Sequence, residues 1–217
     1  MISAAIFDMD GLMFDTEALW ARYWEVSLSE FGYGFTRRFM TDSLGINKVR
    51  QLEVLREHYG DDMPAEEVFD RCEGLVDDHI SREVPKKPGL DELLAWLGDA
   101  GVPMAVASSS PMHEIEACLS STGTRRFFDT IVSGAEVGRS KPAPDVFLAA
   151  AERLGVEPAT SLVLEDSVAG VQAGAAGGFV TVMVPDLAQP TDQIRSLAHA
   201  CCADLNEVVS LLESGRL

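Results

Sequence analysis

Basic residues are scarce in this sequence. Its 217 residues include 17 lysines and arginines against 35 aspartates and glutamates, which gives a formal net charge of −18. A surface with this charge repels nucleic acid and anionic lipid, so partners of these two classes are not expected. It also repels phosphorylated small molecules. A phosphate site in this chain must therefore create its own positive potential, from a metal ion or from a few placed lysines.

Long apolar runs and cysteine ligand motifs are missing as well. No run of 18 apolar residues occurs, so we expect no membrane span. The first residues carry neither a basic segment nor a cleavage site, which predicts a cytoplasmic protein without a signal peptide. The four cysteines form no CxxC pair, and their spacing favours buried reduced thiols, although the neighbours Cys201 and Cys202 could in principle oxidise.

Short apolar runs alternate with helical patterns along most of the chain. Runs without polar alternation predict buried strands at 4–7, 102–107, 128–132, 161–164 and 179–184. Helical spacing of apolar residues predicts helices at 90–100, 111–121, 144–154, 168–176 and 206–213. Alternating strands and helices are typical of βαβ units, so the predicted fold class is α/β with a Rossmann-like parallel sheet.

The region from residue 16 to residue 82 breaks this alternation. Apolar residues have helical spacing at 17–31, 49–59 and 65–80, and no strand-like run interrupts them. A stretch rich in Pro and Gly at 84–89 then marks a linker. We therefore predict an α/β core of residues 1–15 and 83–217, with an inserted small α-helical cap domain of residues 16–82. The insert follows the first strand closely, so it lies where open α/β sheets bind ligands and is placed to act as a lid.

Polar residues follow four of the predicted strands at the point where each strand ends. Because the carboxyl ends of parallel strands share one edge of the sheet, we expect these residues to lie together. They are Asp8, Asp10 and Gly11 after the first strand, Ser108, Ser109 and Ser110 after the second, Lys141 in a loop after the third, and Glu165 and Asp166 after the fourth.

This set of residue types is suited to phosphoryl transfer. Asp8, Asp10 and Asp166 would form a cluster of carboxylates, which is unfavourable unless a cation lies among them, and hard oxygen ligands suit Mg²⁺. Ser108 and the amides that follow it would bind an anion at a helix N-terminus, and Lys141 would add a fixed positive charge. A carboxylate surrounded by these groups can form a covalent aspartyl intermediate.

Two aspartates separated by a single residue can take different roles. Asp8 would attack phosphorus while binding the metal. Asp10 would bind the metal through its carbonyl, and its free carboxyl would protonate the leaving oxygen and later deprotonate a water. Gly11 permits the tight turn that follows. Each residue taken singly has a simpler interpretation as a turn, N-cap or surface residue, so the hypothesis depends on the convergence of all four strand ends.

The motifs resemble those of the haloacid dehalogenase superfamily. The longer strings are similar to its branch of β-phosphoglucomutases and sugar-phosphate phosphatases: FDMDGL at 7–12, FDTE at 14–17, SKPAPD at 140–145 and LEDS at 164–167. The resemblance covers the whole chain and implies a Rossmann-like core with a small helical cap.

The resemblance also implies roles for individual residues. Asp8 would be the nucleophile and Asp10 the general acid and base. Mg²⁺ would be held by Asp8, the Asp10 carbonyl and Asp166, with Glu165 in support, and Ser108 and Lys141 would bind the phosphoryl group. The segment 12–16 would be the flap and hinge of the cap. Family members with Asp at the position of Asp10 act on phosphate esters, which argues against dehalogenation.

One departure favours a phosphatase over a mutase. The β-phosphoglucomutases carry a histidine at the position that matches Trp20. A mutase also needs a second phosphate site in the cap, where Lys48 or Arg50 could contact substrate or could equally be exposed helix cations. We therefore predict a monomeric Mg²⁺-dependent phosphohydrolase acting on a small phosphorylated metabolite of the sugar-phosphate kind.

Two alternatives stay open at this point. One is a β-phosphoglucomutase-like sugar phosphomutase. The other is a non-catalytic binding protein on this fold, against which the complete motif set argues. The sequence does not name the substrate, because fold alone does not fix function.

Overall fold

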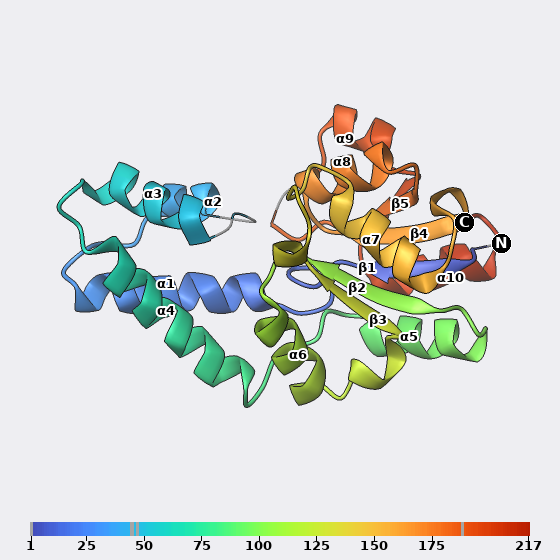
Figure 1. Ribbon diagram of the computed structural model, residues 1–217, viewed down its shortest axis with the longest axis horizontal. Coiled ribbons are helices and arrows are strands. Elements are labelled where there is room, and N and C mark those ends of the chain that lie inside the picture. Colours follow the sequence, from blue (N-terminus) through green and yellow to red (C-terminus); the bar gives the residue numbers. More distant parts are fainter. Residues whose placement is uncertain (1, 44–45, 47, 188) are drawn as a thin grey trace.

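The computed structural model describes residues 2–43, 46, 48–187 and 189–217. A parallel β-sheet forms the centre of the part that lies on the right in Figure 1. Six strands lie in the order β3-β2-β1-β4-β5-β6, and each neighbouring pair is parallel. The strands are β1 (Ala4–Phe7), β2 (Met104–Ser108), β3 (Thr130–Ser133), β4 (Ser161–Glu165), β5 (Val180–Met183) and β6 (Ala200–Cys201). The order reverses direction between β1 and β4, as in Rossmann-like sheets.

Burial on both faces explains why the strands appear as continuous apolar runs. In β1, Ala5 and Phe7 pack into one hydrophobic cluster, while Ile6 between them packs into a second cluster on the opposite face. The register places Phe7 beside Leu164 on β4 and beside Val106 on β2. A strand covered in this way has no solvent-facing side, so polar residues do not alternate along it.

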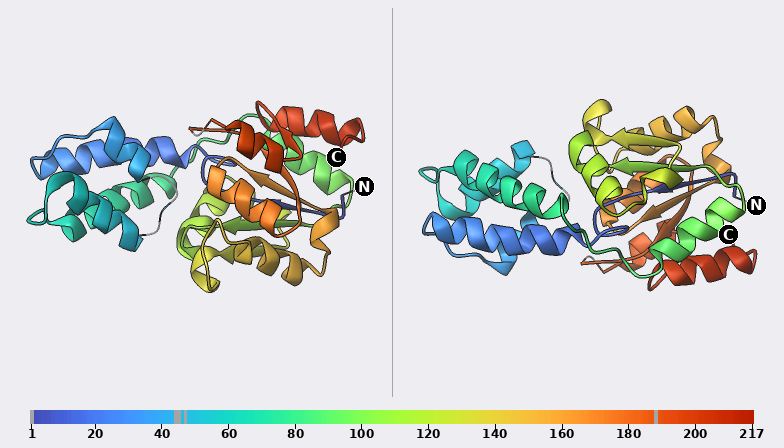
Figure 2. Two further views of the ribbon diagram at one scale, coloured as in Figure 1. Left: turned by 90° about the horizontal axis from the view of Figure 1, so that it is seen from above. Right: turned by 90° about the horizontal axis from the view of Figure 1, so that it is seen from below.

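Helices cover both faces of the sheet, as the edge-on views of Figure 2 show. The cluster around Ile6 is completed by α7 (Asp145–Leu154) and α8 (Val168–Ala176). The opposite cluster is completed by α5 (Leu90–Asp99), α6 (Met112–Ser121) and α10 (Leu205–Glu213). α9 (Asp192–Leu197) packs against α8, and short 3-10 helices lie at η1 (Arg125–Phe127), η2 (Gly134–Glu136) and η3 (Pro158–Thr160). None of the described helices is long and apolar enough to span a bilayer.

The inserted segment is helical and lies beyond the end of β1 (Figure 1). Its helices are α1 (Thr16–Glu30), α2 (Arg37–Asp42), α3 (Lys48–Tyr59) and α4 (Ala65–Ile80). Two connecting segments join it to the sheet side by side, because the Asp15 amide donates to the Pro85 carbonyl and the Lys87 amide donates to the Met13 carbonyl, each at 2.9 Å. The division into a core and a cap domain stays a prediction.

The predicted fold class is confirmed, and most predicted elements lie within two residues of their observed bounds. α2, α9 and β6 were not predicted. α2 and α9 have six residues each, and β6 has two. Segments this short contain less than two periods of helical spacing, so their apolar pattern carries little information, and their place in the fold comes from tertiary packing.

Trp24 is the largest fully buried side chain of the insert, with an exposed fraction of 1%. Its ring packs edge-on against Phe39 at 5.2 Å and Phe69 at 5.9 Å, so one residue of α1 contacts both α2 and α4. We expect Trp24→Ala to lower the free energy of unfolding by about 3–5 kcal/mol, because it leaves a large cavity. The matched control Val26→Ala, on the exposed side of α1, should change it by less than about 0.5 kcal/mol.

Urea titration followed by far-UV circular dichroism measures both values. Equal losses for the two variants would contradict the assignment of Trp24 as the centre of the helical insert.

Candidate active site

The candidate site lies where β1 and β4 end, at the point where the strand order reverses direction. Asp8 follows the last residue of β1, Glu165 is the last residue of β4, and Asp166 follows it. Because Phe7 and Leu164 are register partners, Asp8 and Glu165 end up side by side. Open α/β sheets bind their ligands in this crevice. The fold thus brings together residues that are more than 150 positions apart in the sequence.

Three buried carboxylates meet at this point. Asp8, Glu165 and Asp166 each place one carboxylate oxygen within 4.8 Å of the others, and all three residues are buried. Burial raises the pKa of Asp8 well above its ordinary value, and the neighbouring charges of Glu165 and Asp10 raise it further. Burial, Glu165 and Asp8 raise the pKa of Asp166 in the same way. The group is therefore short of positive charge.

Lys141 supplies part of that charge. Its Nζ lies 2.5 Å from Asp8 Oδ1 and 2.6 Å from Glu165 Oε1, and its side chain is only 7% exposed. Burial alone would lower the pKa of the Lys141 ammonium, but the Asp8 and Glu165 carboxylates outweigh it and the net pKa is raised. The lysine therefore stays protonated between the two acids. Its peptide bond to Pro142 is cis.

Glu165 is fixed from its other side by the start of α8. Its Oε2 accepts from the Ser167 amide at 2.8 Å and from the Ser167 hydroxyl at 2.9 Å. Gly170 leaves room for this carboxylate, because a Cβ at that position would lie 1.8 Å from Glu165 Cδ. A glycine inside a helix lowers helix propensity, so its presence here is explained by the space that Glu165 occupies.

Asp10 is held by hydroxyl groups. Its Oδ1 accepts from Thr16 at 2.7 Å, and its Oδ2 accepts from Ser110 at 2.7 Å and from Ser108 at 3.1 Å. Thr16 opens α1 and Ser108 ends β2. The carboxylates of Asp8 and Asp10 therefore have different surroundings although the two residues are two positions apart. The contacts from Ser110 and Thr16 were not predicted.

Gly11 makes the turn that directs the chain away from β1. Its φ is +77°, in the left-handed region that favours glycine. A Cβ at Gly11 would also lie 2.5 Å from Asp166 Oδ2. Both the backbone conformation and the contact exclude a side chain here, so Gly11 lets the chain pass close to the carboxylate cluster.

Oxygen donors of this kind fit Mg²⁺. The cluster has three buried carboxylates and one ammonium nearby, and burial together with mutual repulsion raises the pKa values of Asp8 and Asp166. A divalent cation would relieve the repulsion. Mg²⁺ is bound in proteins through one or two carboxylates and retained waters, together with phosphate oxygens of the substrate. Asp8 and Asp166 are placed to be its ligands, with Glu165 held by Ser167 and Lys141 beside them.

Two predicted binding residues lie apart from this group. Ser109 is exposed in the loop after β2. Lys48 begins α3 and pairs with Asp70 at 2.9 Å and Glu73 at 3.3 Å, with its Nζ 4.4 Å from the centre of the Phe69 ring. No described contact links Lys48 to the strand ends, so its role toward substrate stays a prediction.

Sequence reasoning missed a second charged group beside the cluster. Lys87 Nζ lies 2.7 Å from Asp186 Oδ1 and 3.3 Å from Asp15 Oδ1. Glu17 lies nearby, where burial, followed by the charges of Asp186 and Asp10, raises its pKa to about 7. Asp186 follows β5, so the strand-end pattern that found the other acids could have found this one.

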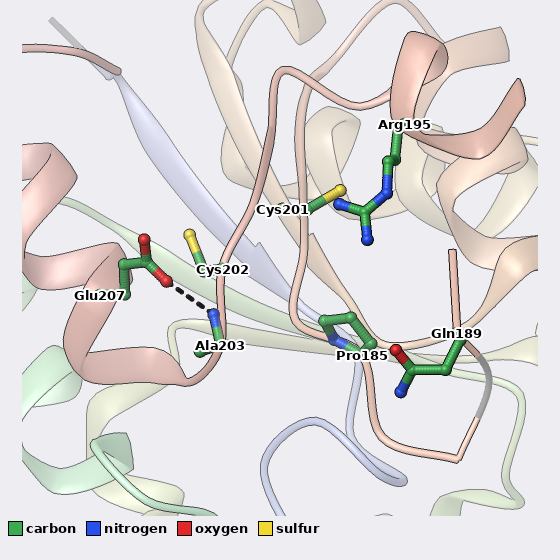
Figure 3. Close-up of a pocket in the computed structure, with 7 residues that line it drawn as sticks. All are labelled: Pro185, Gln189, Arg195, Cys201, Cys202, Ala203 and Glu207. Carbon is green, nitrogen blue, oxygen red and sulfur yellow. Dashed lines mark hydrogen bonds between the residues drawn. The ribbon is translucent and has the colours of Figure 1, made fainter. Parts of the chain in front are cut away.

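A separate hollow of about 350 Å³ lies near the β5–β6 edge (Figure 3). It is lined by Pro185, Gln189, Arg195, Cys201, Cys202, Ala203 and Glu207. None of these residues belongs to the carboxylate cluster. The hollow contains two of the cysteines, which are free like the other two; Cys202 is buried and Cys201 is partly exposed.

Comparison with known proteins agrees with this geometry. Residues 5–184 match the model of the haloacid dehalogenase-like hydrolase family. Hexitol phosphatase B of Escherichia coli K12 is 34% identical over 212 residues, which cover 96% of this chain and 95% of that protein. Fructose-1-phosphate phosphatase YqaB of the same organism is 33% identical over 179 residues, which cover 82% of this chain and 94% of that protein.

Solved structures give the same result. CbbY from Rhodobacter sphaeroides in complex with phosphate superimposes with a TM-score of 0.82 at 26% identity, covering 96% of each chain. A putative β-phosphoglucomutase from Thermotoga maritima superimposes with a TM-score of 0.82 at 26% identity, covering 98% of this chain and 99% of the other.

The chain belongs to the haloacid dehalogenase-like hydrolases. Within this family it belongs to the branch that includes the sugar-phosphate phosphatases, and it is an enzyme of the phosphatase type. The predicted family and enzyme class are confirmed.

Glu114 on α6 gives the site a pH-dependent neighbour. Burial raises its pKa from 4.5 to about 8, and the charges of Asp10, Asp77 and Glu73 contribute. The folded protein thus binds the Glu114 proton more tightly than the unfolded chain does. The stability that this proton provides is fully present below pH 4.5 and is lost as the pH rises through 8.

We expect Glu114→Gln to gain stability relative to the wild type by roughly 2–4 kcal/mol between pH 5 and pH 9, because glutamine has no proton to lose. Urea unfolding at several pH values measures this difference. Glu116→Gln on the same helix is the control, since Glu116 is 43% exposed and paired with Arg125. Parallel pH curves for the wild type and Glu114→Gln would contradict the assignment.

Proposed function

We propose that this chain is a Mg²⁺-dependent phosphohydrolase that acts on a small phosphorylated metabolite, a sugar phosphate, through an aspartyl-phosphate at Asp8. The observation that carries the proposal is that two aspartates on one loop have different surroundings. Asp8 is buried against Lys141 in the carboxylate cluster, while Asp10 is held by three hydroxyl groups. A nucleophile and a separate acid–base group need this difference in environment.

Substrate binding depends on local positive charge in an acidic protein. Lys141 is the cation beside Asp8. Ser108 ends β2, which is next to β1 in the sheet order, and Ser109 follows it in the exposed loop. When bound between Asp8 and Asp166, with the Asp10 carbonyl as a further ligand, Mg²⁺ would neutralise phosphoryl oxygens and the nucleophile together. Lys141 would then contact the transferring phosphoryl, so that two anions can approach each other.

In the first step Asp8 attacks phosphorus and the bond to the leaving oxygen breaks. Asp10 enters this step protonated on one carboxyl oxygen and gives that proton to the leaving oxygen. The Thr16, Ser108 and Ser110 hydroxyls, which contact both Asp10 oxygens, keep its carboxyl oriented. In the second step Asp10, now a carboxylate, accepts a proton from water. The water attacks the phosphoryl group, phosphate leaves, and Asp8 is regenerated.

The substrate class rests on the relatives. Hexitol phosphatase B and fructose-1-phosphate phosphatase YqaB are named for small phosphorylated carbohydrates, and both cover most of this chain. The helical insert beyond β1 would close over such a substrate and exclude water. A monomeric state and a cytoplasmic location stay predictions, and both are compatible with this function.

A sugar phosphomutase is the competing proposal, because putative β-phosphoglucomutases are among the structural neighbours. Two observations favour hydrolysis. Trp20 stands where the resemblance to β-phosphoglucomutases would place a histidine, and the centre of its ring system lies 6.1 Å from those of both Trp24 and Phe69. Lys48, a candidate for a second phosphate site, is paired with acidic residues of α4.

Asp8→Asn should abolish release of phosphate while the protein stays folded, because the amide cannot attack phosphorus. Asp10→Asn should behave differently with p-nitrophenyl phosphate, whose leaving group needs no proton. We expect a rapid burst of one p-nitrophenol per enzyme and then slow turnover, since only the hydrolysis of aspartyl-phosphate lacks its base. Stopped-flow absorbance measures the burst.

The exposed Asp192→Asn is the matched control and should retain full activity. The wild type with EDTA should lose activity and regain it on addition of Mg²⁺. Full turnover by Asp8→Asn would refute the covalent mechanism, and turnover unaffected by EDTA would refute the metal dependence.

A second experiment separates hydrolysis from isomerisation. The enzyme is incubated with β-glucose 1-phosphate, Mg²⁺ and a trace of the bisphosphate, and with a panel of hexose and hexitol phosphates. We expect free phosphate from members of the panel and no accumulation of glucose 6-phosphate, measured by a coupled dehydrogenase assay. Glucose 6-phosphate formed faster than free phosphate would establish the mutase instead.

A further inference from the structure

Asp186 has a buried oxygen without a hydrogen-bond partner. Its Oδ1 pairs with Lys87 Nζ at 2.7 Å, and the side chain is 18% exposed. Its Oδ2 is inaccessible to solvent and, in the part of the chain that the structure describes, finds no partner. A buried carboxylate oxygen left unsatisfied costs about 1–3 kcal/mol or more, so such an atom requires an explanation.

The position of Asp186 Oδ2 explains why it has no partner. Asp186 Oδ2 lies 3.4 Å from the point where a Cβ on Gly11 would stand, and Asp166 Oδ2 lies 2.5 Å from the same point. Two acidic oxygens thus face each other across the bare side of Gly11. Asp166 belongs to the carboxylate cluster that fits a cation. The unpartnered atom is therefore directed at the edge of that cluster.

Asp186 is not one of the residues whose carboxylate oxygens gather closely at this site. The residues with carboxylate oxygens within 4.8 Å of one another at this site, over the described positions, are Asp8, Glu165 and Asp166. A carboxylate one layer further out can accept from a water on the metal, and Mg²⁺ retains several waters in protein sites. Such outer carboxylates orient the first coordination shell and strengthen metal binding.

We propose that Asp186 is a positioning residue of the magnesium site, whose Oδ2 accepts a hydrogen bond from a water in the coordination shell of the cation. The inference rests on the proposed function, because it needs the cation that Asp8 and Asp166 would hold. It assigns a role to a strand end that the family motifs leave out.

Lys87 holds Asp186 in the required orientation. Its Nζ binds Asp186 Oδ1 and also reaches Asp15 at 3.3 Å, while its amide donates to the Met13 carbonyl. With Oδ1 occupied in this way, Oδ2 is the atom that faces Gly11. The ion pair also spreads the charge of Asp186, which reduces its repulsion of Asp166.

Isothermal titration calorimetry with Mg²⁺ alone tests the proposal without turnover. Asp186→Asn should weaken Mg²⁺ binding about 10-fold, the usual effect of losing an outer-shell carboxylate. The weakening should persist in 0.5 M KCl, because salt screens a long-range loss of charge but not a contact of a buried group. Asp192→Asn, exposed on α9, is the charge-matched control and should bind as the wild type does.

Lys87→Met separates the effect of losing the ion pair from the effect of losing the Asp186 carboxylate. It removes the same Lys87–Asp186 contact but leaves the carboxylate, so it should weaken Mg²⁺ binding clearly less than Asp186→Asn does. Equal weakening in Lys87→Met and Asp186→Asn would overturn the proposal in favour of a structural ion pair. Circular dichroism confirms that each variant is folded.

Asp166→Asn separates a failure of the role of Asp186 from a failure of the proposed metal site. If Asp166→Asn loses Mg²⁺ binding while Asp186→Asn binds like the wild type, the role of Asp186 is refuted and the proposed metal site stands. If Asp166→Asn binds Mg²⁺ as the wild type does, the metal site of the proposed function is refuted, and the role of Asp186 with it.

Discussion

The ammonium of Lys141, held between Asp8 and Glu165, is the interaction on which this site depends. Three carboxylates cannot be buried together at the ends of two neighbouring strands without positive charge. Lys141 provides it from a loop that follows another strand, and Ser167 fixes Glu165 from the start of α8. The centre is thus tied to several elements at once, and it still lacks the charge that a divalent cation would bring.

The positive charge of Lys141 lies within a strongly acidic protein. The net charge of −18 opposes the approach of any phosphate ester, so binding must come from the few groups at the strand ends. Glycines make this possible by letting the backbone approach the acids. A side chain at Gly11 or Gly170 would collide with Asp166 or Glu165. The site is therefore compact, with little room for change around the carboxylates.

The contacts of Asp10 connect the site to the helical insert. Thr16 is the first residue of α1, and its hydroxyl binds the Asp10 carboxylate, while Ser108 and Ser110 bind it from the end of β2. The orientation of this carboxyl thus depends both on the sheet and on where α1 begins. Lys87 lies beside this connection and links it to the loop after β5. The insert and the chemistry of the site are physically coupled.

The sequence alone determined the fold class, the family and the residues at four strand ends, because apolar runs, turn residues and short acidic motifs are local features of the chain. It did not reveal Asp186 or Thr16 as partners of the site, and it placed Ser110 at a strand end without revealing its contact with Asp10. Their role arises when β5, α1 and the loop after β2 are brought against the ends of β1 and β4. That proximity is set by strand order and register, which depend on packing between residues far apart in the sequence.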